Sequence, residues 1–144
     1  MDNKYYKKYM KYKTKYLELA RGGDNNVKQV HVNEPWFSLI KSGTKKAEGR
    51  LNKGLFASFN ENEIVVWFNI DKRTRQRKEV KTKIVKVNKY KTFEEMLTAE
   101  GLDKVLPDKE NIKTIKDGVN VYRQWYNEQV EKQYGVVAIV LEVI

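Results

Sequence analysis

The chain has 144 residues, 40% of them hydrophobic and 12% aromatic, which predicts one folded domain with a hydrophobic core. It contains no cysteine, which excludes disulfides, cysteine metal sites and cysteine nucleophiles. Because the chain also contains only one histidine, we expect neither a bound metal nor a cofactor. No apolar run approaches the ~20 residues of a membrane span, and the amino terminus lacks the apolar core of a signal peptide. We therefore expect a cytoplasmic or nuclear protein that is neither secreted nor bound to a membrane.

The formal net charge of +10 is concentrated in two segments. Residues 1–21 carry seven basic and two acidic groups, for a net charge of +5. Residues 72–91 carry ten basic groups and one acidic group, for a net charge of +9, so the rest of the chain sums to −4. Basic segments on a slightly acidic body indicate contact with a polyanion more strongly than an even excess would.

The first 20 residues place tyrosines and a leucine on one helical face and lysines over the rest. The glycines and turn-forming residues of 21–26 then interrupt the helical pattern. We interpret residues 1–26 as an appended basic Tyr/Lys-rich helix and linker, and residues 27–144 as the folded domain. Three interpretations of residues 1–20 stay open: a helix that lies on the body or in solvent, an arm that binds nucleic acid or a protein partner, and a helix on a membrane surface.

The first half of the domain is predicted to contain three strands and one helix. Residues 27–32 and 62–70 are typical strands, the second one buried because of its apolar, β-branched run. A helix is expected from Pro35 to about Ser42, with Gly43 ending it, and a short strand follows within 45–51.

The second half is predicted to continue with a strand over 79–90, whose buried face changes at Ile84-Val85, as a β-bulge would produce. Thr92 and Glu95 have capping-box spacing for the next helix, and 101–108 is expected to be irregular. A single helix within 117–135 then leads to a hydrophobic last strand, which we expect at the centre of the sheet. Interleaved helices and strands without a regular βαβ order predict an α+β fold, a small curved sheet or barrel with helices at its ends.

The segment EPWFSLIKSGTKKAEGR, residues 34–50, resembles the signature of the ASCH domain family. That signature has a proline and an aromatic residue at a helix start, followed by G-x-K-x-x-E-G-R. The matching residues are Pro35, Trp36, Gly43, Lys45, Glu48, Gly49 and Arg50. The resemblance covers roughly 27–144 and implies a PUA-like fold, a small β-barrel with helices covering its ends. It also implies a cleft in which the Lys, Glu and Arg of the motif face RNA or a nucleotide. The Tyr/Lys block at the amino terminus resembles proteins of large DNA viruses, which would place the protein in the cytoplasm or nucleus of a host cell.

The motif residues suit recognition of a nucleic acid. In an extended strand Glu48 and Arg50 share one face. Arginine offers a planar fork for phosphate or a base edge, lysine a point charge, and glutamate can accept from the exocyclic amine of a base. We take Lys45, Glu48, Arg50, Gly43 and Trp36 as the ligand-binding set. A structural ion pair that seals the end of the barrel is the alternative for the charged residues. Trp36 either stacks on a base or belongs to the core.

The basic segment 72–91 has two interpretations. It can form a hairpin that contacts phosphates, or a solvated edge strand whose lysines oppose aggregation. The predicted phosphate contacts are Arg73, Arg75, Arg77, Lys78, Lys81 and Lys83.

Catalysis is the alternative function. Some ASCH proteins are amidohydrolases that remove an acyl group from a modified cytidine with a Lys, a Thr and a Glu. The resemblance places that Lys at Lys45 and the Thr at Glu48, and a loose alignment places the catalytic Glu at Glu100. Because the Thr position is occupied by Glu48, this set would have to act as a metal-independent hydrolase with Glu48 as a general base for water. We predict an RNA-binding or nucleotide-binding module, with hydrolysis of a modified nucleoside or RNA as the alternative.

Overall fold

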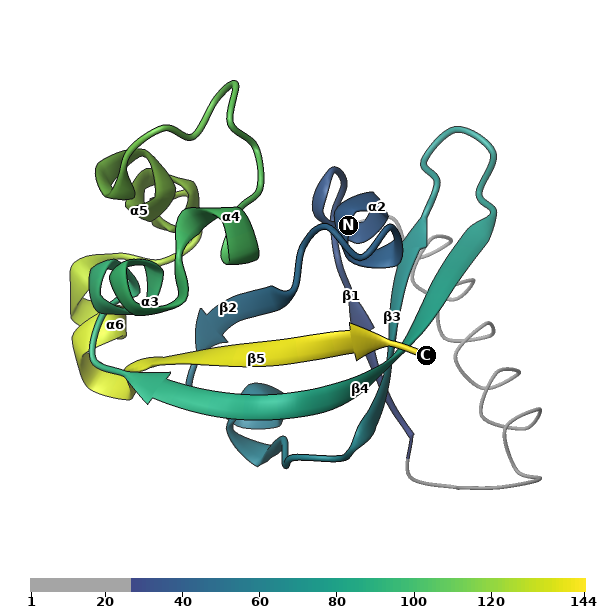
Figure 1. Ribbon diagram of the computed structural model, residues 1–144, viewed down its shortest axis with the longest axis horizontal. Helices are drawn as coiled ribbons and strands as arrows, with labels where there is room; N and C mark the ends of the chain where they lie inside the picture. The colour runs from purple at the N-terminus through teal and green to yellow at the C-terminus, as the bar shows by residue number, and fades with distance from the viewer. Residues whose placement is uncertain (1–26) are drawn as a thin grey trace.

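The computed structural model describes residues 27–144 (Figure 1), and the predictions made for residues 1–26 lie outside this range. Its strands are β1 (Lys28–His31), β2 (Ala47–Leu51), β3 (Ile64–Ile70), β4 (Arg77–Tyr90) and β5 (Val136–Val143). Its helices are α2 (Trp36–Lys41), the 3-10 helix η2 (Gly54–Ser58), α3 (Phe93–Glu100), α4 (Leu102–Val105), α5 (Ile115–Arg123) and α6 (Glu128–Tyr134).

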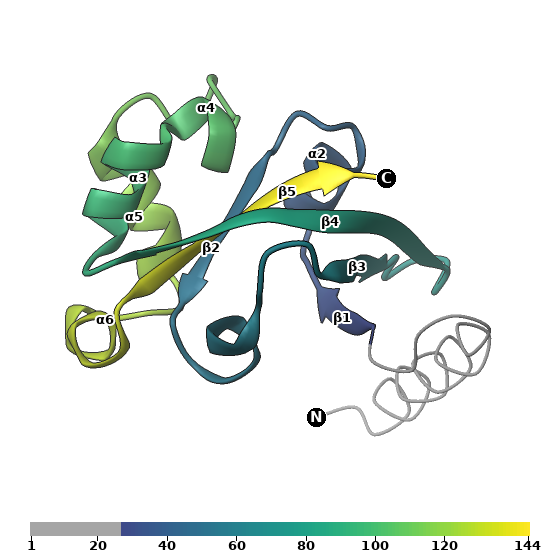
Figure 2. The same cartoon turned by 60° about the horizontal axis from the view of Figure 1, so that its bottom comes forward.

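Within the described residues, the strands form one five-stranded sheet in the order β1-β3-β4-β5-β2. β1 pairs parallel with β3, and every other pair is antiparallel. β4 and β5 cross the molecule as long strands, and the sheet curves into a half-barrel (Figures 1 and 2). The predicted α+β, PUA-like architecture is confirmed, as is the central position of the last strand, because β5 lies between β4 and β2.

The bulge predicted near Ile84-Val85 is also confirmed. The register of β4 against β5 shifts between Ile84 and Lys86, and Val85 is exposed between them. Before the bulge, every second side chain of β4 from Val80 on is buried, as the sequence alternation predicts. The extra residue bends the strand and helps the sheet curve.

The core consists of a cluster inside the half-barrel and a cluster under the helices. The first gathers side chains of β1, β3, β4, β5 and α2, and the second packs α3, α4 and α5 against β2 and β5. Trp36, at the start of α2, packs against both clusters. Trp67 is fully buried in the first cluster, as predicted, and its indole N–H donates to the Thr82 hydroxyl at 2.8 Å.

The helices were predicted less completely than the strands. Thr92 caps α3 by accepting from the Glu95 backbone N–H at 3.0 Å, as its spacing predicted. Residues 101–108, expected to be irregular, contain α4, and the single helix expected within 117–135 is divided into α5 and α6. Asn127 causes this division, because its side chain accepts from the Val130 N–H and so starts a new helix. No described helix combines the length and the apolar character that crossing a membrane requires.

Glu131 holds the helical layer together. Its buried carboxylate accepts from the Phe93 backbone N–H at 3.0 Å and from Arg123 at 3.1 and 3.3 Å. These bonds join α6 to the start of α3 and to the end of α5, where the residues of the candidate site are found.

We predict that Glu131→Ala lowers the free energy of unfolding by about 3 kcal/mol, because a buried N–H and a guanidinium lose their partner. Urea denaturation of the full chain measures this change. Glu128→Ala, an exposed residue of the same helix, should stay within ~0.5 kcal/mol of the parent chain. Equal effects of the two substitutions would show that the Glu131 contacts contribute nothing.

Candidate functional site

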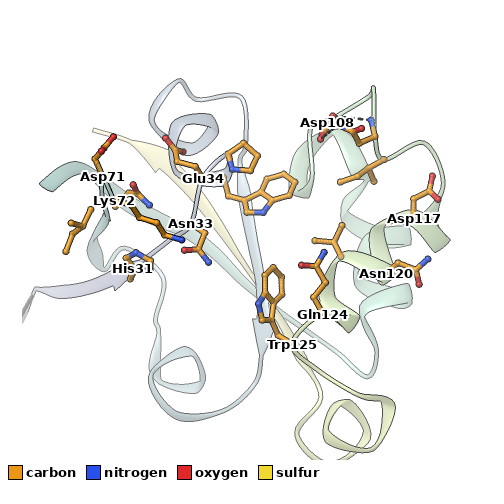
Figure 3. A pocket seen from close by; sticks show the side chains of 17 residues that line it. His31, Asn33, Glu34, Asp71, Lys72, Asp108, Asp117, Asn120, Gln124 and Trp125 are labelled. Atoms are coloured by element: carbon orange, nitrogen blue, oxygen red, sulfur yellow. Dashed lines mark hydrogen bonds between the residues drawn. The ribbon is translucent and has the colours of Figure 1, made fainter. Parts of the chain in front are cut away.

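An inner cavity of about 270 Å³ lies between the half-barrel and the helical layer. Its walls come from β2, from the end of β1 and the residues after it, and from the end of α5. It adjoins a wider outer groove of about 910 Å³, and both are lined by His31, Asn33, Trp36, Val121 and Trp125. In Figure 3, His31, Asp71 and Lys72 lie on one side of this groove and Asp117, Asn120 and Gln124 on the other.

Strand β2 supplies two charged side chains to the inner cavity. Glu48 and Arg50 both line it, as the strand period predicts. Gly49, between them, is buried against the helical layer. A Cβ at Gly49 would lie 2.7 Å from the Met96 side chain and from the Tyr122 hydroxyl oxygen, so a larger residue here would force these two side chains to move.

Lys45 lies behind Glu48 rather than in the cavity. Its fully buried ammonium donates to the backbone oxygens of Ala47, at 2.8 Å, and of Val105. It lies 3.6 Å from Glu48 Oε1 and 5.4 Å from the ring centre of Trp36. Burial lowers the pKa of Lys45, whereas the neighbouring Glu48 carboxylate acts in the opposite direction. Lys45 therefore positions Glu48 and ties α4 to β2.

Arg50 completes the charged row and is open to a ligand. Its Nη2 lies 3.8 Å from Glu48 Oε2 and donates to the His31 backbone oxygen at 3.4 Å. The guanidinium stacks over Phe56, 4.7 Å from the ring centre, and 27% of the side chain is exposed. Burial, and then the charge of Arg50, lower the pKa of His31, so the imidazole is uncharged at neutral pH. The positive charge on this wall of the cavity belongs to Arg50.

Aromatic side chains surround the cavity. Trp36 is partly buried and lines both the cavity and the groove, whereas Trp125 is 55% exposed between α5 and α6. Tyr122 is buried, and its ring stacks on Phe93 with centroids 4.1 Å apart and planes 8° apart. Sequence reasoning expected one aromatic residue of this late segment, Tyr122, Trp125 or Tyr126, to reach the cleft without deciding which one, and all three line the cavity.

The outer groove is rich in carboxylates and amides. Its polar lining consists of Glu34, Asp71, Asp108 and Asp117, of Asn33, Asn69, Asn111, Asn120 and Gln124, and of His31 and Lys72. Backbone N–H groups lower the pKa of Asp71 and of Asp117, so both are ionised at neutral pH. The groove itself therefore repels phosphate and offers hydrogen bonds to bases and sugars.

The predicted phosphate contacts lie outside the cavity and the groove. Arg77 contacts Glu79 at 2.5 Å and Gln29 at 2.6 Å, and it lies over Phe68, which gives it a structural role. The lysines predicted on β4, Lys81 and Lys83, are exposed and alternate with buried residues, so they lie on the outer face of the sheet. The remaining members are exposed in or beside the β3–β4 loop: Arg73, Arg75 and Lys78. This loop borders the groove through Lys72.

The other predicted residues are also placed away from the cavity. Gly43 ends α2 with a φ of +80°, a backbone conformation that favours glycine. The Glu100 carboxylate accepts from Asn88 and Lys104, at 2.9 and 2.8 Å, and from the Tyr90 hydroxyl. Of the alternative catalytic set, only Glu48 is among the described residues that line the inner cavity.

We predict that Lys45→Met lowers the free energy of unfolding by about 1–3 kcal/mol, because two buried carbonyls and Glu48 lose a donor while the volume stays similar. Thermal or urea denaturation measures it. Lys46→Met removes the same charge from an exposed neighbour and serves as the control. If the Lys45→Met variant were as stable as the parent chain, the hydrogen bonds of the buried ammonium would make no net contribution to stability.

Comparison with known proteins agrees with this architecture. The ASCH domain family model matches residues 30–144. The crystal structure of hypothetical protein PH0355 is 38% identical, with a TM-score of 0.68 over 81% of this chain and 97% of that one. The solution structure of protein PF0455 from Pyrococcus furiosus is 33% identical, with a TM-score of 0.62 over 81% of this chain and 96% of that one. No curated protein sequence matches significantly. The chain belongs to the ASCH domain family.

Proposed function

We propose that this protein binds single-stranded RNA and takes one base into the inner cavity. The observation that carries the proposal is the combination of Glu48 and Arg50 with the aromatic side chains of Trp36 and Trp125 around one small cavity. ASCH domains are generally thought to bind RNA, which agrees with this chemistry.

The dimensions of the cavity favour a single base. At about 270 Å³ it falls just below the ~300–1,000 Å³ of typical ligand pockets, so it suits a small planar group and excludes a duplex. Single-stranded RNA is commonly read by splaying out unstacked bases onto aromatic side chains. Trp125 is exposed enough for such stacking, which contributes about 1–3 kcal/mol per base.

The charges suggest where the phosphates would lie. The acidic lining of the outer groove disfavours the RNA backbone, whereas Arg50, Lys72 and the β3–β4 loop offer positive charge along one border. A strand whose bases face the amides of the groove and whose phosphates follow that border satisfies both conditions. Such contacts make the affinity fall as the salt concentration rises.

Hydrolysis is less well supported by this geometry. A general base must reach the ligand, and Lys45 is occupied by two backbone carbonyls while Glu100 accepts three hydrogen bonds elsewhere. Glu48 alone of these three remains in contact with the cavity. We therefore propose binding without turnover.

Fluorescence anisotropy of a short labelled single-stranded RNA, titrated with the full chain over a salt series, tests the proposal. We expect saturable binding that is at least about tenfold weaker for the annealed duplex. Arg50→Gln and Trp125→Ala should each weaken binding about fivefold to twentyfold, through a lost charge-assisted bond and lost stacking. Lys132→Gln, an exposed lysine of α6, controls for the loss of one positive charge.

Binding that changes equally in Arg50→Gln and Lys132→Gln, and not in Trp125→Ala, would indicate general charge attraction and contradict the proposal. Chromatography of the same RNA after incubation would detect products if the site turned its ligand over, which would favour the hydrolase instead.

A further inference from the structure

We infer that the backbone of Gly49 reads the bound base. Its N–H and C=O pair with the Watson–Crick edge of one unpaired base, so the site rejects a base that is methylated on that edge. The inference rests on the proposed function and adds to it the group that recognises the base.

The free edge of β2 is the first reason. Within the described residues β2 is an outer strand of the sheet, and β5 is its one neighbour. In an antiparallel pair, residues that bond to the neighbouring strand alternate with residues whose N–H and C=O point away from it. The Leu141 N–H donates to the Lys46 oxygen at 2.8 Å. The Asn52 N–H donates to the Gly135 oxygen at 3.0 Å. These bonds at the two ends of β2 assign its even-numbered residues to β5, so the N–H and C=O of Gly49 point to the free edge.

Gly49 keeps both of its backbone groups at this edge. Its counterparts on either side are Ala47 and Leu51. The Ala47 oxygen accepts from Lys45, and the Leu51 oxygen accepts from the Lys53 N–H at 2.8 Å. Among the described residues, neither the N–H nor the C=O of Gly49 has a hydrogen-bond partner. One such pair is too short to hold an added β-strand, which needs a row of them, but it matches the edge of a single base.

The free edge faces the inner cavity. Gly49 lines the cavity, and because it has no side chain, its backbone atoms form that part of the wall. The cavity is also lined by Glu48, on one face of β2, and by Tyr122, which lies against the other face. A space that touches both faces of a strand extends past an edge of that strand, and the other edge is occupied by β5. Across the free edge lies the end of β1, where the His31 oxygen accepts from Arg50 at 3.4 Å.

Both groups are held in place before a ligand binds. The residues on either side of Gly49, Glu48 and Arg50, are paired with β5, and the Met96 side chain lies against Gly49 from the helical layer. A group that is already fixed loses little conformational freedom on binding.

The two groups define what the ligand must offer. A backbone N–H donates and a C=O accepts, so the ligand needs an acceptor beside a donor. Uracil and guanine present a carbonyl beside a ring N–H on the Watson–Crick edge, and adenine and cytosine present an unprotonated ring nitrogen beside an amine. Gly49 therefore requires a free edge rather than one particular base. A base that is paired in a duplex, or methylated on this edge, does not meet the requirement.

The test compares the affinity of the full chain for two short labelled oligomers, one of 3-methyluridine and one of 5-methyluridine. The methyl group replaces the proton of the Watson–Crick edge in the first and lies away from that edge in the second, so the two match in size and charge. In fluorescence anisotropy the 3-methyluridine oligomer should bind at least about tenfold more weakly, because the Gly49 oxygen loses its donor. The 5-methyluridine oligomer should bind no more weakly than oligouridine.

Nuclear magnetic resonance of the ¹⁵N-labelled full chain observes the backbone group itself. A substitution would not isolate this group, because a Cβ at Gly49 would lie 2.7 Å from the Met96 and Tyr122 side chains. Saturating oligouridine should shift the Gly49 amide proton downfield and slow its exchange with solvent. Gly43 is the matched control and should show neither change, because its N–H already donates to the Ile40 oxygen at 3.0 Å and it does not line the cavity.

Equal affinity for the two methylated oligomers, with Arg50 and Trp125 still required for binding, would overturn this inference and leave the proposed function standing. A Gly49 amide that is unchanged when oligouridine saturates the protein would overturn it too. Failure of oligouridine and of both methylated oligomers to bind would reject the inference and the proposed function together.

Discussion

A buried ammonium group determines the shape of this site. Lys45 is enclosed between the carbonyls of Ala47 and Val105, and among the described residues Glu48 supplies the carboxylate that pairs with it. Taking a charge out of water is costly, and the cost is offset here by hydrogen bonds to backbone that belongs to β2 and to the end of α4. The ammonium thus connects a strand of the half-barrel to the helical layer, and the orientation of Glu48 toward the cavity depends on that connection.

The remaining features of the site follow from this arrangement. The strand period brings Arg50 to the same wall as Glu48, and the glycine between them lets α3 and α5 approach closely enough to enclose the cavity. The close approach in turn places the Tyr122 ring over β2. The charges of Glu48 and Arg50, the strand period and the absence of a side chain at Gly49 therefore act together over three consecutive residues, which form one wall of the candidate site.

Sequence reasoning succeeded where the signal is local or periodic. The cap at Thr92 and the alternation and bulge of β4 depend on short-range chemistry, so the sequence alone indicated them. A strand at the centre of a sheet needs an apolar run, so the run in β5 indicated its position. It failed for α4, a single turn that is held by contacts from distant residues such as Lys45, which no local pattern can reveal.

The candidate site shows the same division. The pairing of Glu48 and Arg50 was predictable from the strand period, and the family signature identified the segment. The sequence could not show that Lys45 lies behind Glu48, since the spacing of these two residues is equally compatible with a lysine side chain in the cavity. Nor could the sequence show that the Tyr122 hydroxyl has no hydrogen-bond partner among the described residues, because this depends on which polar groups the fold brings close to it.

Trp36 packs against the cluster inside the half-barrel and against the cluster under the helices, and it also lines the cavity. A ligand that touches this indole therefore touches the seam between the two parts of the core. Ligand binding and the packing of the two clusters against each other are then thermodynamically linked, so an occupied site raises the free energy needed to separate the half-barrel from the helical layer. The protein would open most readily along that seam when the site is empty, and amide hydrogen exchange in α5 and β2 would slow together when it is filled.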